Sequence, residues 1–387
     1  NSPDQAKKAW ENYLKMDSTS QWANEARDRL QKLETNKPIS QTKEEVLRDF
    51  LEAKQNNDHE KAWKALSRNR EMITGKLIPQ QLAFLFVEAK ATSDNRKAKE
   101  YLEALEYAGK LEQEKSGDLF WKEIAKFYST VSNEKVVFLK QAHENLKKGY
   151  SLCQKSRYRN ALEFFNKSNE AFSLAKSIEE IKISDYWISY CQYHLSQISE
   201  SNNLLSLISS YARAKNYKWL EAQALYRSVN NYQGLREYSK AIKAAQNSVE
   251  IAETISDDYL GKKALLQLAD NYCQIQNPQA TLKSLEKVFD LLKIHETSLR
   301  ERWRVLFFSA EIFLALNHYK TSVIFGREAV LTAKKLEDST LIHASYIHLS
   351  KIFSSIGKWD EAVQFATESL QIAQTEADEE TRKKSLG

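Results

Sequence analysis

The sequence predicts an all-α fold built of stacked helical hairpins, and two observations predict it. In Ser345–Ala373, apolar residues recur about every 3.6 positions on both sides of a short turn at Gly357–Asp360. This pattern is typical of two amphipathic helices joined by a tight turn. The small helix residue Ala362 also has counterparts upstream at intervals of about 40 residues. These counterparts are Ser322, Thr281, Ala241, about Asn202, and Ala161. The sequence therefore predicts an array in which each hairpin covers the apolar face of its neighbour.

The last of these hairpins resembles a tetratricopeptide repeat. Its residues match the family's order of bulky, small and aromatic positions, namely Tyr346, Leu349-Ser350, Phe353, Gly357, Ala362, Ala366 and Ser369. The usual length of that repeat is ~34 residues, so this array resembles a longer type with about 40 residues per unit. The resemblance implies a right-handed α-solenoid whose first helices line a concave groove.

The helical pattern divides the chain into three predicted regions. Residues 1–40 resemble a partial tetratricopeptide helix pair. Residues 41–131 are helical but out of phase with the repeat, with helices expected near 42–55, 59–73, 79–92, 95–114 and 117–131. They are either degenerate repeats or a separate helical module. Residues 132–387 form an array of about six repeats, and residues 380–387 are interpreted as the start of a further first helix.

Composition and charge exclude several classes of function. The 57 basic and 52 acidic residues are mixed along the chain and leave a net charge of +5, which is typical of a solvated surface and not of a nucleic-acid interface. No run of ~18 apolar residues is present, so no membrane span is expected. The three cysteines, Cys153, Cys191 and Cys273, have no metal or disulfide spacing. They are predicted to be reduced thiols of a cytoplasmic protein.

Motifs for catalysis are not evident in the sequence, and no metal or other cofactor is expected. There is no phosphate-binding glycine loop, no nucleophile elbow and no zinc-binding His-Glu-x-x-His. Cys191 and His194 share a helix face, but nothing in the sequence orients the imidazole as a base. His343 and His348 are five residues apart, which turns them away from each other on a helix. The chain itself is therefore predicted not to be an enzyme.

A ligand surface is implied by the resemblance, because the first helices of a tetratricopeptide array expose a fixed set of residues in the groove. Carried onto this sequence, the predicted binding residues are Trp187, Tyr226, Arg227, Asn230, Lys263, Gln267, Asp270, Arg304, Phe308 and Glu311. Amide side chains can pair with the N–H and C=O groups of an extended peptide, and aromatic side chains supply anchor area. The alternative is that these polar residues only solvate the helices, while the aromatic residues pack between repeats.

Three functional hypotheses follow. The first is a scaffold or regulatory region that binds a peptide or protein in its groove. Its parent resembles the bacterial tetratricopeptide proteins that carry a CHAT (caspase-like) protease domain, because of the period and of segments such as Ala333–Asp338 and Ala9–Asp17. The second is a peptide receptor and response-regulator phosphatase of the Rap type, with Gln55, Gln80 and Gln81 as candidate residues. The third is a static scaffold that binds partners on its convex face.

Overall fold

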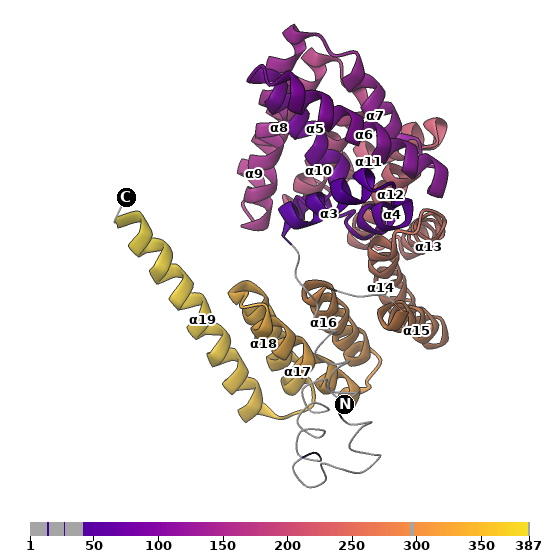
Figure 1. Ribbon diagram of the computed structural model, residues 1–387. Coiled ribbons are helices and arrows are strands. Elements are labelled where there is room, and N and C mark those ends of the chain that lie inside the picture. The colour runs from indigo at the N-terminus through magenta and orange to yellow at the C-terminus, as the bar shows by residue number, and fades with distance from the viewer. Residues whose placement is uncertain (1–13, 15–26, 28–41, 295–297, 386–387) are drawn as a thin grey trace. The chain divides into compact units, whose positions relative to one another are not determined.

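The structure is a computed structural model that describes Leu14, Arg27 and residues 42–294 and 298–385 (Figure 1). Within these ranges the chain is helical and contains no β-strand. The helices are α3 (Lys43–Gln55), α4 (His59–Arg68), η1 (Met72–Thr74), α5 (Ile78–Ala91), α6 (Asn95–Ser116), α7 (Phe120–Ser129), α8 (Asn133–Gln154), α9 (Tyr158–Ala175), α10 (Ile178–His194), α11 (Ile198–Lys215), α12 (Lys218–Gly234), α13 (Tyr238–Thr254), α14 (Asp258–Gln274), α15 (Pro278–Ile294), α16 (Leu299–Ala315), α17 (Tyr319–Lys335), α18 (Ser339–Ser355) and α19 (Trp359–Ser385). The predicted fold class is confirmed.

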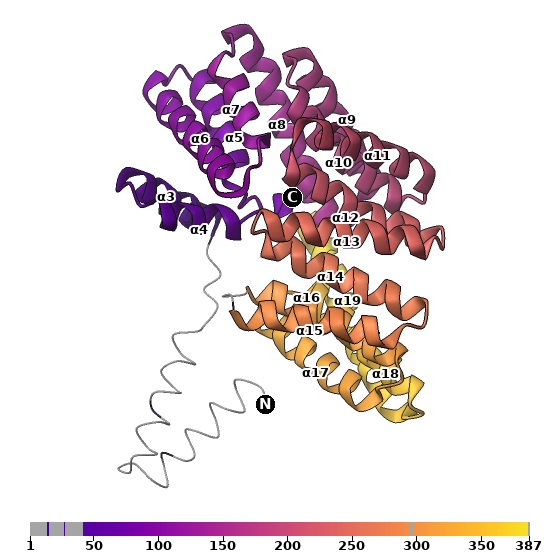
Figure 2. The same ribbon diagram turned by 90° about the vertical axis from the view of Figure 1, so that its right-hand side faces the viewer.

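The chain divides into two compact units, which are described separately. The first is Gln41–Ser284 and contains α3 to α14 and the start of α15. In it, each helix from α8 to α14 packs against the next, and the first helices α10, α12 and α14 also contact one another in turn (Figure 2). The second begins at Leu285, and its helices α16 to α19 pack consecutively. The predicted three-part division of the chain stays a prediction.

The 40-residue period is visible in the backbone as well as in the sequence. Each turn between the two helices of a hairpin contains one residue in the left-handed conformation, with φ between 56° and 76°. These residues are Ser156, Ser196, Arg236, Gln276, Asn317 and Gly357. Described turns between successive hairpins contain an equivalent residue, at Lys176, Asn216, Ser256 and Glu337. A left-handed residue ends each helix abruptly and sends the chain back along the preceding one.

Small residues on the second helices allow close packing inside each hairpin. Ala161 and Ala241 are fully buried at the predicted position. The expected counterpart Asn202 is wrong by one residue, because Ser201 occupies the fully buried position and Asn202 is only half-buried. The Ser201 hydroxyl donates a hydrogen bond to the carbonyl of Ser189, 2.8 Å away on α10. A hydroxyl at this position thus replaces a methyl group without leaving a buried polar atom unsatisfied.

The helices differ from the predicted ones in two places, one before the regular array and one at its C-terminal end. The helix expected over 59–73 ends at Arg68, and a separate 3₁₀ turn follows at Met72–Thr74. No new helix starts near residue 380, because α19 continues to Ser385. Residues 374–385 contain no glycine or proline, and their Glu, Lys, Arg and Ala residues favour continuation of a helix. The predicted helix pair in residues 1–40 lies outside the described residues, apart from Leu14 and Arg27.

One carboxylate fixes the start of α12 against the helices that precede the array. Asp118 Oδ1 accepts a hydrogen bond from the backbone N–H of Phe120 (3.0 Å), and Oδ2 accepts one from the N–H of Trp219 (2.9 Å). The side chain therefore caps the N-termini of α7 and α12 together, where the helix dipoles favour negative charge. The Lys218 ammonium adds a hydrogen bond to the carbonyl of Ser116 at 2.8 Å. The position of α12 therefore depends on α6 and α7.

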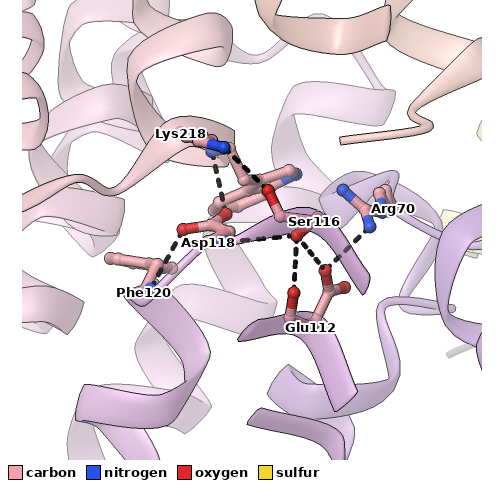
Figure 3. A network of polar contacts seen from close by, with 7 residues as sticks. Arg70, Glu112, Ser116, Asp118, Phe120 and Lys218 are labelled. Carbon is pink, nitrogen blue, oxygen red and sulfur yellow. Dashed lines mark hydrogen bonds and ion pairs between the residues drawn. The ribbon is translucent and has the colours of Figure 1, made fainter. Parts of the chain in front are cut away.

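A buried ion pair continues this network toward α4. Arg70 Nη2 donates to Glu112 Oε2 at 2.8 Å, and both side chains are almost completely buried. The Ser116 hydroxyl connects this pair to Asp118, since it bonds the Glu112 carbonyl and accepts from the Asp118 N–H (Figure 3). Burial raises the pKa of Glu112 to about 7, and the Arg70 charge opposes that shift. The segment that follows α4 and the helices α6, α7 and α12 are thereby joined by polar contacts inside the core.

A second buried network lies between α7, α8 and α10. The Tyr128 hydroxyl is 2.8 Å from Glu180 Oε2 and 2.7 Å from His143 Nε2, and Ser177 also donates to Glu180 at 2.9 Å. Burial raises the pKa of Glu180 to about 7 and lowers the pKa of His143 to about 3. Both shifts favour the neutral form of a group that is removed from water.

The turn geometry predicts opposite effects for two serine-to-glycine substitutions. Ser196 is exposed and has a φ of 64°, whereas Ser206 is exposed in the middle of α11. Ser196→Gly should raise the free energy of unfolding by about 1 kcal/mol, because glycine adopts this conformation without a Cβ clash. Ser206→Gly should lower it by about 0.5 kcal/mol. Urea denaturation of both variants tests this, and equal effects would contradict the role assigned to the turn.

The Glu180 network predicts a pH-dependent stability. The pKa of Glu180 in the folded protein is raised above its ordinary value of 4.5, so the stabilisation from this group is complete below pH 4.5 and is lost as the pH rises through 7. Glu180→Gln removes the ionisation and should reduce the loss of stability between pH 5 and pH 8 by up to roughly 3 kcal/mol.

Urea denaturation at pH 5 and pH 8 measures this difference. Glu200→Gln, at an exposed position of α11, is the control and should leave the pH dependence unchanged. An identical loss of stability in the Glu180→Gln variant and the unsubstituted protein would show that Glu180 does not titrate in this range.

Candidate ligand-binding surface

Six of the predicted binding residues gather on two neighbouring first helices of the first unit. Tyr226, Arg227 and Asn230 lie on α12, while Lys263, Gln267 and Asp270 lie on α14. Positions three and four apart share a helix face, so each helix presents its set in one direction. All six side chains are partly exposed. We call these six residues the α12–α14 strip.

Polar contacts connect the two sides of the strip. The Gln267 amide donates a hydrogen bond to Asn230 Oδ1. One turn further on, Gln233 Nε2 donates to Asp270 Oδ2 at 2.7 Å. The Lys263 ammonium lies 4.4 Å from the centre of the Tyr226 ring, within the range of a cation–π interaction. Three side-chain contacts therefore connect α12 to α14.

Arg227 extends the strip to α10. Its guanidinium carbon lies 4.2 Å from the centre of the Tyr190 ring, and Nη2 donates to the Tyr186 hydroxyl at 3.1 Å. The Tyr226 ring is also near, at 5.7 Å. The Arg227 Nε–H is buried and has no hydrogen-bond partner. Tyr186 and Tyr190 are contributors that the sequence reasoning missed, although they stand 40 residues before Tyr226 and Asn230 in the repeat register.

The predicted residue Trp187 is not part of the exposed strip. Its side chain is only 4% exposed and packs between α8, α9 and α10. Its ring centre lies 4.9 Å from that of Tyr150 and 5.7 Å from that of Phe165. Trp187 occupies the repeat position of Arg227, but a large apolar ring gains more from burial than from facing water.

The three remaining predicted residues lie on α16 in the second unit and are described apart from the strip. Phe308 is 42% exposed, so it offers apolar surface to a ligand. Glu311 Oε1 lies 4.0 Å from His348 Nε2 on α18, and burial lowers the pKa of His348 to about 4. Arg304 is half-buried on the same helix. These residues form a separate group on α16 and α18.

Two cysteines that are far apart in the sequence lie close together between α8 and α10. The sulfur atoms of Cys153 on α8 and Cys191 on α10 are 3.8 Å apart, and both side chains are buried. The neighbouring thiol and burial raise the pKa of Cys191 well above its usual range. Both residues are free thiols in the structure, and their separation of 38 positions is close to one repeat. That near-match to the period was the signal that could have indicated their contact.

The described residues offer no evident reaction centre. No group of three or more His, Cys, Asp or Glu side chains that could hold a metal ion is found among them. His194 stacks face to face on Tyr158, with ring centres 4.0 Å apart. Of the three candidate glutamines, Gln55 is exposed, Gln80 donates to the Tyr150 hydroxyl at 2.9 Å, and Gln81 is half-buried. Over the same described part of the chain, no helix is both long and apolar enough to cross a membrane.

Comparisons with known proteins agree with the repeat architecture. No model of a known protein family matches the chain. The response regulator aspartate phosphatase J of Bacillus subtilis (strain 168) is 25% identical over 179 residues, which cover 46% of this chain and 44% of that protein. The match thus spans less than half of the relative.

Solved structures are similar to this chain in fold. A crystal structure of a Rap protein complexed with competence and sporulation factor has a TM-score of 0.52 at 11% identity, covering 78% of this chain and 98% of that one. A Pyrococcus horikoshii signal transduction ATPase with a tetratricopeptide repeat sensor has a TM-score of 0.47 at 16% identity, covering 96% and 56%. With the regular hairpins described above, the chain has a tetratricopeptide-like helical-repeat fold.

Proposed function

We propose that this chain is a regulatory peptide-binding scaffold that holds an extended peptide across α10, α12 and α14. The observation that carries this proposal is the α12–α14 strip, in which Arg227 also contacts tyrosines on α10. It combines amides, aromatic rings and charges of both signs on the exposed side of adjacent first helices. The group on α16, with Phe308 as its exposed ring, is proposed as a separate ligand contact within the second unit.

The amide groups of the strip are suited to a peptide backbone. Asn230 and Gln267 bond each other in the structure, and the buried Gln267 Oε1 has no hydrogen-bond partner. An unpaired buried acceptor costs about 1–3 kcal/mol. A rotation of the Gln267 side chain that turns this oxygen toward a peptide N–H recovers that energy. The Asn230–Gln267 pair can exchange its mutual bond for backbone N–H and C=O groups without a net loss of hydrogen bonds.

The dimensions of the surface set the length of the ligand. Packed helices have axes about 10 Å apart, so α10, α12 and α14 together span about 20 Å. An extended chain advances about 3.3 Å per residue. A peptide of about six residues therefore reaches from Arg227 and Tyr190 on one side to Asp270 on the other.

The likeness to response regulator aspartate phosphatase J supports a regulatory role of this kind. The solved structure of a Rap protein with a bound factor supports the same reading through its fold alone. The attached CHAT-type protease domain and the cytoplasmic location stay predictions.

Groove binding predicts a selective effect of Asn230→Ala. Incubation with a soluble random hexapeptide library, followed by gel filtration and mass spectrometry of the retained peptides, identifies peptides that bind. Asn230→Ala should weaken their binding by about tenfold, because one charge-neutral backbone contact of about 1.4 kcal/mol is lost. Asn203→Ala, at an exposed position of the second helix α11, is the matched control and should bind as the unsubstituted protein does.

The alternative function is a scaffold that binds partners on its convex face. Alanine substitutions in the groove distinguish the two functions. Combined alanine substitution at Tyr226 and Asn230 should abolish peptide retention if the groove is the site. Unchanged retention by that double variant would favour binding on the outer face.

We propose as a second candidate a phosphatase activity toward the aspartyl phosphate of a response regulator. The named activity of the Bacillus subtilis relative favours it. Gln55 is the exposed member of the three candidate glutamines and lies at the end of α3, so it is accessible for positioning a water molecule. The reaction is hydrolysis of the acyl phosphate to a carboxylate and inorganic phosphate.

Phosphorylated receiver domains that have been labelled with acetyl phosphate provide the assay. Addition of this protein should accelerate the loss of phosphate, and Gln55→Ala should abolish the acceleration. Gln154→Ala, outside α3, is the control. An unchanged rate of dephosphorylation with the unsubstituted protein would eliminate this candidate.

A further inference from the structure

We propose that Cys153 and Cys191 are a redox-active pair, which a peroxide oxidises to a reversible disulfide between α8 and α10. This inference does not depend on the proposed peptide-binding function. It starts from the two sulfur atoms, which are 3.8 Å apart although they belong to different hairpins. Both residues are free thiols in the structure. The pair is therefore a site where a covalent modification can join two helices.

The two sulfur atoms are close enough to form a bond without a rearrangement of the helices. A disulfide bond is about 2.05 Å long, so atoms that start 3.8 Å apart must approach each other by roughly 1.8 Å. If both sulfur atoms move, each shifts by about 0.9 Å, which is the size of ordinary thermal displacements in ordered parts of a protein. The folded chain therefore already holds the pair near bonding distance.

An aromatic contact beside the cysteines fixes the distance between their helices. Tyr150 lies one turn before Cys153 on α8, and Trp187 lies one turn before Cys191 on α10. Both rings are buried, and their centres are 4.9 Å apart. Because this contact joins the same two helices as the sulfur contact does, the thiols cannot drift apart. Two groups held in this way react as intramolecular partners at a high effective concentration.

The oxidation proceeds in two balanced steps. Cys153 is 5% exposed and lies three residues before the exposed turn residue Ser156, whereas Cys191 is completely buried, so the peroxide meets Cys153 first. The Cys153 sulfur attacks one oxygen of hydrogen peroxide, the O–O bond breaks, and a sulfenic acid and one water molecule form. The Cys191 sulfur then attacks the sulfenic sulfur, the S–O bond breaks, and the hydroxide leaves with the thiol proton as a second water molecule. The two thiols lose two electrons and two protons, and the peroxide gains them.

Cys273 provides an internal comparison for this chemistry. It is a half-buried free thiol on α14, and it is more exposed than either member of the pair. Among the three cysteines, all of which the structure describes, the recorded sulfur contact is the one between Cys153 and Cys191. Exposure alone would direct oxidation to Cys273, whereas proximity directs disulfide formation to the buried pair.

The test treats the complete, reduced chain with hydrogen peroxide, blocks the remaining thiols with iodoacetamide and digests the product with trypsin. Cleavage places the three cysteines on separate peptides, namely residues 149–155, 183–213 and 264–283. Mass spectrometry should find the first two peptides joined with the loss of two hydrogen atoms, and dithiothreitol should release them. The chain oxidised in concentrated urea is the control. It should give all three pairings, because unfolding removes the fixed spacing.

The disulfide also predicts a change in thermal stability. It closes a loop of nearly one repeat and so lowers the conformational entropy of the unfolded chain. Oxidation should raise the midpoint of thermal unfolding by about 5–10 °C. Cys191→Ala should abolish both the joined peptides and the rise in the midpoint. Cys273→Ala is the matched control and should retain both, and circular dichroism verifies that the variants remain helical.

Three outcomes would overturn the inference. The first is an oxidised, folded chain in which no joined peptide is found. The second is a crosslink in which residues 264–283 replace one of the two expected peptides. The third is a bond between Cys153 and Cys191 that forms in urea but not in the folded chain. Analysis of the joined peptides in the unsubstituted protein decides the question even where a variant does not fold, and none of these outcomes affects the proposed function.

Discussion

The structure depends on one constraint, which is that no hairpin can bury its own apolar face. Each pair of amphipathic helices leaves one side uncovered, and the next pair covers it. This works only if every hairpin enters and leaves at the same angle, so the turns must be uniform. The left-handed residue in each described turn from α8 to α19 supplies that uniformity. At Arg236 and Gln276 a non-glycine residue accepts this conformation, which shows that the covering of apolar surface outweighs a local cost of about 1 kcal/mol.

The start of the regular array cannot be covered by a preceding repeat in phase with it, and α3 to α7 pack there instead. The contacts at the start of α12 are polar and buried, with Asp118 capping two helices and Glu112 paired with Arg70. Such contacts are directional, so they fix how α6 and α7 meet α12 more strictly than apolar packing does. Because α12 carries Tyr226, Arg227 and Asn230, this network also sets the position of the proposed ligand surface.

Most of the fold was predictable because the regular spacing of small and apolar residues reveals the repeat register. The spacing from Ala161 to Ala362 predicted the hairpins, and the helix limits between 178 and 355 follow it. The turn conformations were not predictable, since Arg236 and Gln276 are not typical of left-handed positions and only Gly357 signalled one. The continuation of α19 to Ser385 was missed because a family pattern was carried onto residues that lack any helix stop.

The residues of the proposed ligand surface were predictable only in part, because the repeat register does not specify every feature of a position. It specifies which helix face a residue occupies, and it correctly brought Tyr226, Asn230, Lys263 and Gln267 to one surface. It does not specify how far the neighbouring helix approaches, which decides whether a side chain is covered. Large apolar rings are covered where space allows, as at Trp187.

The same limit explains the contact between Arg227 and Tyr190. Residues on different helices become partners only through the distance between α10 and α12, which tertiary packing fixes. A position in the repeat therefore defines a candidate for binding. Its partners then decide whether it is a packing residue, as Trp187 is, or a partly exposed charged side chain held against tyrosines, as Arg227 is. The chemistry of this surface thus follows from unsatisfied groups that remain after the helices have packed.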